Sequence, residues 1–322
     1  MFTSQEIKAA QDCVYASLRP TPQFEWPLLS EAFGSKSGSG TKVWVKHENH
    51  QPVGAFKVRG GLTYFDALVK REPQTAGVIA ATRGNHGQSI AFAARQHGMK
   101  ATIVVPHDNS VEKNAAMRAL DVELIEHGSE FQESREHAAK LAVERGLHFV
   151  PSYHRDLLLG VMTYWIEFFE AVQPDVTYVP IGMGSGFCAA AAARAHTGVK
   201  TKLIGVVSAH ATAYMDSFKA RKLLEAPVST QIADGMACRV PDLDALDVII
   251  REAADVITVT DTQLKAAMRL LFTATHNVAE GAGAASLAAA MQQKDQLRGL
   301  VVGTTLCGGN VDADVFAQVL AG

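Results

Sequence analysis

Residues 78–98 read VIAATRGNHGQSIAFAARQHG. The first four are all apolar, as is typical of a strand buried on both faces of a parallel sheet. A polar turn around Gly84 follows, and residues 88–97 then have the apolar spacing of a helix. The stretch therefore predicts a strand, a turn and a helix in succession, the unit from which α/β folds are built.

The same alternation recurs along the chain. Strands are expected at residues 42–46, 78–81, 101–105, 122–125, 149–150, 176–180, 203–208, 256–259 and 300–302. Helical patterns such as 111–120 and 130–145 lie between them, and Gly98, Gly128 and Gly146 are expected to end helices. Residues 34–41, GSKSGSGT, predict a flexible surface loop. The pattern favours an α/β fold with helices on both faces of its sheets.

The composition is that of a globular protein that is free in solution. The chain has 322 residues, which suggests about two domains, and a net charge of −3, which gives no electrostatic case for a nucleic-acid or membrane partner. The N-terminal segment predicts an amphipathic helix and not a signal peptide, and no apolar run is long enough to span a membrane. The cysteines form no CxxC pair, so a zinc site or disulfide framework has little support and a reducing, cytoplasmic location is expected: Cys13, Cys188, Cys238 and Cys307.

A lysine lies in the glycine-rich segment 48–61, ENHQPVGAFKVRGG. Lys57 stands at a loop-to-helix junction, where burial and the positive end of a helix would destabilise its ammonium form, as catalysis by a lysine requires. The alternative is a surface lysine in a glycine turn.

The turn after the strand at 78–81 carries candidates for binding a carboxylate: Thr82, Arg83, Asn85 and His86. Free backbone N–H groups at the start of the following helix would add to them. The alternative is an ordinary turn in which Asn85 caps the helix and His86 is structural.

Two further loops follow predicted strands. Residues 180–187, PIGMGSGF, allow the backbone to wrap around a phosphate, but they lack the spacing of a dinucleotide or nucleoside triphosphate site. Residues 304–312, TTLCGGNVD, would place one small polar group against a bound ring. The alternative for the latter is a C-terminal turn with a buried cysteine.

Together these loops resemble the fold type II pyridoxal-5′-phosphate (PLP) enzymes, in particular the threonine dehydratase and serine racemase family. The family's lysine motif, K-x-E-x-x-Q-x-x-G-S-F-K-x-R-G, is matched here except that Ala55 replaces serine: Lys46, Glu48, Gln51, Gly54, Phe56, Lys57, Arg59 and Gly60. The family's other motifs correspond to residues 83–86, Gly182–Gly186, Ile232–Gly235 and Cys307–Asp312. The resemblance runs from about Pro20 to the C-terminus.

The resemblance implies a role for each matching residue. Lys57 would hold PLP as a Schiff base and then take the α-proton of the substrate, and Phe56 would lie against the ring. Cys307 would face the ring nitrogen, with Glu280 nearby. The phosphate would be bound by Gly182, Met183, Gly184, Ser185 and Gly186. Asn85 would also hydrogen-bond the cofactor's 3′-oxygen. The substrate would be contacted by Thr82, Arg83, Asn85, His86 and Gly235.

Three departures from the family pattern bear on activity. Arg83 replaces the serine that acts as the second acid–base group in racemases. An arginine is a poor proton shuttle at neutral pH, but it can bind a carboxylate in bidentate fashion. The alternative is an arginine that faces solvent or a structural acid. His210 replaces a metal-binding glutamate and leaves Asp216, so we predict no metal. Residues 151–163 lack the family's acidic pair and G-Q-G-T, which leaves the substrate open.

The activity implied is removal of water and then ammonia from a β-hydroxy amino acid, giving a 2-oxo acid. A thiol at the ring nitrogen stabilises a carbanion less than a carboxylate does, which suits loss of a β-leaving group. Serine and threonine are the default substrates, and 3-hydroxyaspartate and phenylserine are alternatives. The alternative activity is racemisation of serine or aspartate, and the non-enzymatic alternative is a PLP-binding regulatory protein.

The architecture implied is two α/β domains with PLP between them. A small substrate-closing domain, residues 77–151, would be inserted into a large PLP-binding domain formed by residues 1–76 and 152–322. The family further implies a homodimer or larger homo-oligomer. At this length, no additional regulatory domain is expected.

Overall fold

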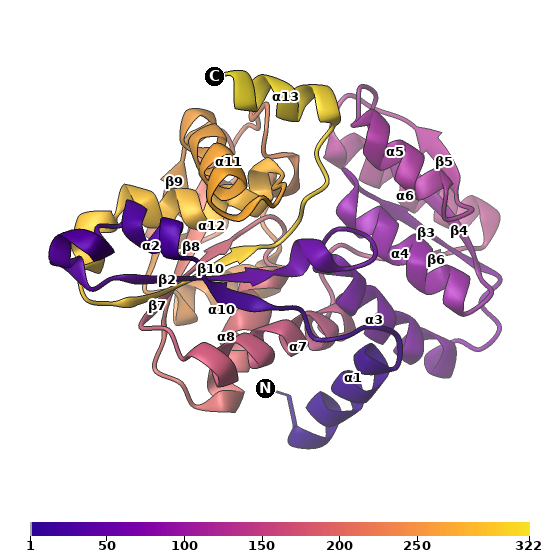
Figure 1. Cartoon of the computed structure of the whole chain (residues 1–322). Coiled ribbons are helices and arrows are strands. Elements are labelled where there is room, and N and C mark those ends of the chain that lie inside the picture. Colours follow the sequence, from indigo (N-terminus) through magenta and orange to yellow (C-terminus); the bar gives the residue numbers. More distant parts are fainter. Residues whose placement is uncertain (1) are drawn as a thin grey trace.

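The unit predicted at residues 78–98 is present as strand β3 and helix α4 in the computed structural model, which describes residues 2–322 (Figure 1). The strands are β1 Gln23–Glu25, β2 Lys42–His47, β3 Gly77–Ala81, β4 Lys100–Val105, β5 Glu123–Glu126, β6 His148–Phe149, β7 Val176–Pro180, β8 Lys202–Ser208, β9 Asp255–Val259 and β10 Val301–Leu306. The helices are α1 Ser4–Ser17, α2 Pro27–Ala32, α3 Lys57–Arg71, α4 Asn85–Gln96, α5 Val111–Arg118, α6 Phe131–Arg145, α7 Arg155–Val172, α8 Ser185–Thr197, α9 Ala213–Ala220, α10 Leu243–Glu252, α11 Asp261–Thr275, α12 Gly281–Gln292 and α13 Ala313–Ala321.

The strands form two sheets. The larger has the order β1-β2-β10-β7-β8-β9 and the smaller β5-β4-β3-β6. Each pair of neighbours is parallel except β1 and β2, which are antiparallel. The predicted α/β fold is therefore confirmed. The strands of the smaller sheet all lie between residues 77 and 149, within the segment 77–151 for which the sequence predicts a separate domain; its boundaries stay a prediction.

The larger sheet is covered on both faces, which explains its uninterrupted apolar strands. In β7, Val176 and Tyr178 pack in one apolar cluster with residues of α12. Their neighbour Val179 packs in another with residues of α7 and α8. Figure 1 shows α11 and α12 on one side of this sheet and α7 and α8 on the other.

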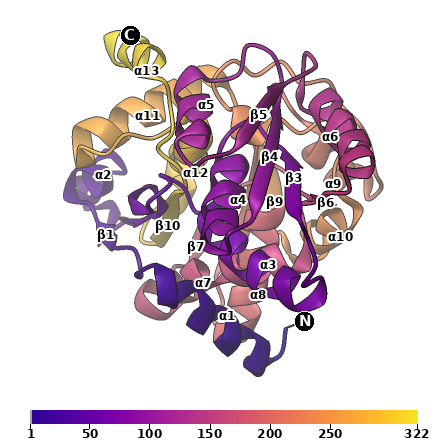
Figure 2. The same cartoon turned by 90° about the vertical axis from the view of Figure 1, so that its right-hand side faces the viewer.

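The smaller sheet is buried in the same way. Val78 and Ala80 of β3 pack with Ile90 of α4, whereas Ile79 and Ala81 pack with residues of α6. Figure 2 shows α4 and α6 on opposite sides of β3 and β4. In open α/β sheets, ligands bind at the carboxyl ends of the parallel strands. The loops that follow these strands in both sheets are therefore the places where functional residues are expected.

The structure differs from the sequence-based expectations in four places. Strand β1 was not predicted because it is an edge strand of three residues, too short to show periodicity. Gly128 does not end a helix: it follows β5 with φ of 85° and precedes α6, whereas Gly98 and Gly146 do lie at the ends of α4 and α6. The loop predicted at 34–41 contains a π-helical turn, Ser35–Ser39. The loop predicted at 304–312 begins later, because β10 continues to Leu306.

In residues 2–322 no helix combines the length and the apolar character needed to cross a bilayer.

Candidate active site

One cavity lies where the turns after β3, β7 and β10 meet the start of α3. The structure brings all the residues predicted for cofactor or substrate to its wall: Phe56, Lys57, Thr82, Arg83, Asn85, His86, Gly182, Met183, Gly184, Ser185, Gly186, Gly235, Glu280 and Cys307. These come from segments far apart in the sequence, so their convergence is not a consequence of local structure.

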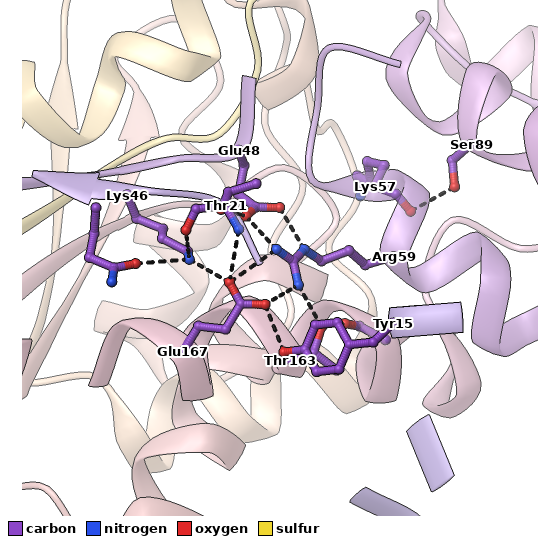
Figure 3. Close-up of polar contacts among 11 residues, drawn as sticks. Tyr15, Thr21, Lys46, Glu48, Lys57, Arg59, Ser89, Thr163 and Glu167 are labelled. Atoms are coloured by element: carbon purple, nitrogen blue, oxygen red, sulfur yellow. Dashed lines mark hydrogen bonds and ion pairs between the residues drawn. The ribbon is translucent and has the colours of Figure 1, made fainter. Parts of the chain in front are cut away.

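Lys57 is the first residue of α3, and its position is fixed through its backbone. The Phe56 N–H donates to the Cys307 carbonyl at 3.0 Å, and the Ser89 hydroxyl donates to the Lys57 carbonyl at 2.6 Å (Figure 3). The Lys57 ammonium donates to the Ser185 hydroxyl at 3.0 Å. The lysine therefore faces the glycine-rich turn that follows β7, and not bulk water.

Burial lowers the pKa of Lys57 to about 8, an effect that the Cys307 thiol partly opposes. No carboxylate within the described chain forms an ion pair with this amine. A large fraction of it is therefore neutral near pH 8, the form that attacks a carbonyl carbon.

A buried group of charges underlies the start of α3. Arg59 contacts Glu48 at 2.8 Å and Glu167 at 2.6 Å, and Lys46 contacts Glu167 at 2.5 Å. Figure 3 shows these side chains pointing toward one another from three segments of the chain. Burial disfavours the charge of Arg59, but the two glutamates outweigh it and raise the pKa of the guanidinium. The pairs hold α3, and with it Lys57, against β2 and α7.

The turn after β7 has room only for glycine at two positions. A Cβ at Gly182 would come within 2.3 Å of the Gly235 carbonyl oxygen. Gly184 has φ of 95°, and its Cβ would come within 2.6 Å of Ala245. Helix α8 begins at Ser185, so its first N–H groups point out of the helix toward the cavity end of β7. This is the arrangement that binds a phosphate without a basic side chain.

The turn after β3 presents a second set of free N–H groups. Gly84 adopts φ of 146°, and the Thr82 hydroxyl accepts from the Gly84 and Gly87 N–H groups at 2.8 and 3.1 Å. The next N–H groups, those of Asn85 and His86, have no partner in the described part of the chain. Burial and the nearby Lys57 lower the pKa of His86 to about 3, so its ring is neutral.

The side chain of Asn85 is held from two sides. It donates to Glu280 at 2.5 Å and accepts from Asn310 at 2.9 Å. One proton of its amide remains for a ligand. Cys307 lies on the same wall, donates to the Ala282 carbonyl at 3.5 Å, and is kept as a neutral thiol because burial raises its pKa.

Lys113 and Asp234 also line the cavity, and neither is among the site residues predicted from the sequence. The Lys113 ammonium contacts Asp234 at 2.7 Å and Glu280 at 2.8 Å. Burial opposes its charge, but the two carboxylates outweigh this and raise the pKa of Lys113. Asp234 lies in the matched Ile232–Gly235 motif, which is a signal that could have found it; Lys113 has none.

The two residues considered for a metal site, His210 and Asp216, belong to no metal-binding cluster among the described residues. His210 is exposed, and Asp216 accepts a hydrogen bond from Thr212 at 2.6 Å. Within residues 2–322 no three His, Cys, Asp or Glu side chains are grouped to hold an ion. That no metal binds stays a prediction.

Comparisons with known proteins agree with this geometry. The family model described as "Pyridoxal-phosphate dependent enzyme" matches residues 14–308. An L-threo-3-hydroxyaspartate ammonia-lyase of Saccharomyces cerevisiae is 32% identical over 99% of this chain and 97% of its own length. An L-threonine ammonia-lyase of Geobacter sulfurreducens is 33% identical over 98% of this chain and 77% of its own. The crystal structure of a pyridoxal 5′-phosphate-dependent aspartate racemase superposes with a TM-score of 0.90 at 28% identity, covering 98% of both chains.

Proposed function

Since the chain belongs to the family of pyridoxal-phosphate dependent enzymes, we propose that it removes water and then ammonia from a β-hydroxy amino acid. The resemblance predicted from the sequence is confirmed, and the chain is an enzyme that uses PLP. The observation that carries the proposal is the contact between the desolvated Lys57 amine and Ser185, which puts a nucleophile next to an anion-binding turn.

The residues present fit this cofactor. The glycine turn Gly182–Gly186, together with the start of α8, suits a phosphate group. The neutral Cys307 thiol suits a ring nitrogen, and the free amide proton of Asn85 suits a ring oxygen. Phe56, whose ring centroid lies 5.1 Å from the Lys57 ammonium, suits a ring face.

In the proposed reaction, Lys57 binds the cofactor covalently through Nζ and, once substrate releases it, takes the α-proton at the same atom. When bound, the cofactor supplies an electron sink that weakens the substrate's α-C–H bond. The Asn85 and His86 N–H groups orient the substrate carboxylate. The β-hydroxyl group leaves as water together with the proton taken from the α-carbon. The enamine released tautomerises to an imine, and water hydrolyses the imine to a 2-oxo acid and ammonia.

The experiment is a 2-oxo acid assay over serine, threonine, 3-hydroxyaspartate and phenylserine of defined stereochemistry. Lys57→Ala should abolish turnover and the visible absorption of the bound cofactor, because the covalent link is lost. Lys70→Ala removes an exposed lysine from the same helix and should change neither. Turnover by the Lys57→Ala variant at the rate of the unaltered chain would contradict the proposal.

Racemisation is the second candidate, because the aspartate racemase is so similar in structure. A racemase needs a second proton donor on the far side of the α-carbon. The cationic side chains that line the cavity besides Lys57 are Arg83, whose guanidinium acts as a donor only, and Lys113, whose pKa Asp234 and Glu280 raise. Neither is suited to release a proton at neutral pH. Chiral chromatography of the residual substrate separates the two activities, since only racemisation yields the opposite isomer.

We also propose that the chain works as a cytoplasmic homo-oligomer. Free thiols at all four cysteines support a reducing compartment, and the exposed apolar side chains of Phe24 and Leu28, 46% and 54% accessible, support a subunit contact. Light scattering on the purified holoenzyme tests the second part; a mass of 34.5 kDa, that of one chain, would contradict it.

A further inference from the structure

The cavity holds one positive charge that the described protein does not neutralise. Three cationic side chains line it, and two are accounted for: Lys57 by the proposed covalent link, and Lys113 by its ion pairs with Asp234 and Glu280. Arg83 forms no ion pair with any residue in 2–322, and its Nε atom is buried without a hydrogen-bond partner. A buried guanidinium nitrogen without an acceptor is costly, so the site is built for an acceptor that arrives with a ligand.

The other anionic groups of a bound cofactor and substrate already have places. The phosphate has the start of α8, and the α-carboxylate has the N–H groups of Asn85 and His86 at the start of α4. Arg83 lies two residues before the start of α4, and its side chain lines the cavity as a separate hydrogen-bond donor. An α-amino acid with a neutral side chain would leave its charge uncompensated.

We propose that Arg83 binds a second carboxylate, carried by the substrate's side chain, and that this enzyme acts on β-hydroxy amino diacids in preference to serine or threonine. This inference rests on the function proposed above and names its substrate class. The planar guanidinium offers two parallel N–H donors to a carboxylate, which a serine at this position could not do. A methyl or hydrogen in place of the carboxylate would forfeit those contacts.

The first test compares kcat/KM for 3-hydroxyaspartate and for serine in the holoenzyme. We expect the diacid to be preferred, and Arg83→Ser to lower its kcat/KM by roughly 10- to 150-fold, the range for hydrogen bonds to charged groups. Serine should change by less than about threefold. Arg83→Lys keeps the positive charge but loses the paired N–H donors, so its kcat/KM for the diacid should lie between those of Arg83→Ser and the unaltered enzyme. Arg95→Ser, near the exposed far end of α4, the helix that follows Arg83, is the matched control and should leave kcat/KM unchanged for both substrates.

Two results would overturn the inference. If Arg83→Ser lowered kcat/KM equally for both substrates, Arg83 would be a contact to the α-carboxylate that all amino acids share. If the unaltered enzyme preferred serine or threonine, no second carboxylate would be recognised.

The second test does not need turnover. Isothermal titration calorimetry of the holoenzyme measures the Kd of succinate and of butyrate. Both are unreactive four-carbon acids, and only succinate has a second carboxylate. Tighter binding of succinate that disappears in Arg83→Ser supports the inference, and equal affinity for the two acids contradicts it. If no β-hydroxy amino acid were turned over while succinate binding still depended on Arg83, the reaction proposed would be wrong and the recognition of diacids right.

Discussion

The Lys57 amine forms no ion pair with a carboxylate of residues 2–322, and burial lowers its pKa to about 8. Below that pH the amine is mostly protonated and cannot attack an aldehyde. We therefore expect the rate at which apoprotein takes up PLP to rise roughly tenfold per pH unit between about pH 6 and about pH 7.5 and to level off above about pH 8. Stopped-flow absorbance of the bound cofactor measures this rate. A rate that did not vary with pH over this range would show that the amine is not the titrating nucleophile.

Residues differ in how far their roles could be predicted from sequence. Lys57 was found because its motif is contiguous and places the lysine at a helix start. Lys113 was not, because its partner Asp234 lies 121 positions away and only the fold brings them together. The position of Arg83 predicts a carboxylate ligand, but only the structure shows that no acid within residues 2–322 forms an ion pair with it.

The turn into α8 tests whether glycine is needed for backbone conformation or for space. Gly184 and Gly98 both have positive φ, 95° and 65°, but a Cβ would meet Ala245 at 2.6 Å in the first case and nothing within 4 Å in the second. Each alanine substitution should cost about 1 kcal/mol or more through strain. Only Gly184→Ala should also weaken PLP binding, by roughly tenfold or more, because it displaces the N–H groups at the phosphate.

Equilibrium dialysis of PLP against both apoprotein variants, with urea unfolding alongside, separates the two effects. Equal PLP affinity in the two variants would count against a phosphate site at this turn.

The buried charges under α3 hold a helix in place and are not replaceable one at a time. Arg59→Leu would leave Glu48 and Glu167 without their main partner in the interior, and a broken buried pair costs about 3–5 kcal/mol. Arg95→Leu removes an exposed arginine and should cost less than about 1 kcal/mol. Urea unfolding of both apoproteins measures the difference in the free energy of unfolding. A loss below about 1 kcal/mol for Arg59→Leu would mean that these charges do not anchor α3.

Most strands could be predicted because a strand that is buried on two faces consists of successive apolar residues. Where buried positions hold polar residues, this apolar pattern is interrupted and the strand is not predicted. Thr304 and Thr305 of β10 are buried: the Thr304 hydroxyl donates to the Trp44 carbonyl, and the Thr305 backbone N–H donates to the Ser286 hydroxyl. Two polar residues therefore end this central strand, and from sequence they favour a loop. Strand β1 could not be predicted for a different reason: it is a three-residue edge strand that buries few side chains, so it has no recognisable apolar pattern.

The contacts between segment 77–151 and the rest of the chain could not be predicted from the sequence. The Lys113 ammonium of α5 reaches Asp234 and Glu280, and the Asp312 carboxylate accepts from the Val111 N–H at 3.1 Å and from the Glu112 N–H at 3.3 Å. Both sets of contacts join the segment 77–151 to the rest of the molecule, those of Lys113 in the wall of the cavity and those of Asp312 outside it. They are the groups through which closure of the proposed small domain on a substrate would be controlled.

Asp312 allows that idea to be tested away from the cavity. It caps the start of α5 from the other segment, while Glu112 in turn accepts from the Ala313 N–H at 2.8 Å. Asp312→Ala should cost about 1 kcal/mol, as loss of a cap does, and favour an open arrangement. We expect faster hydrogen–deuterium exchange in the first turn of α5 and a KM raised several-fold, with the visible spectrum of the bound cofactor unchanged. Asp314→Ala is the control, since Asp314 is an exposed acid two residues further on that, among the described residues, accepts a hydrogen bond only from the Val315 N–H. If both variants exchanged alike in α5, or if KM rose without any change there, this contact would not govern how the small segment sits on the large one.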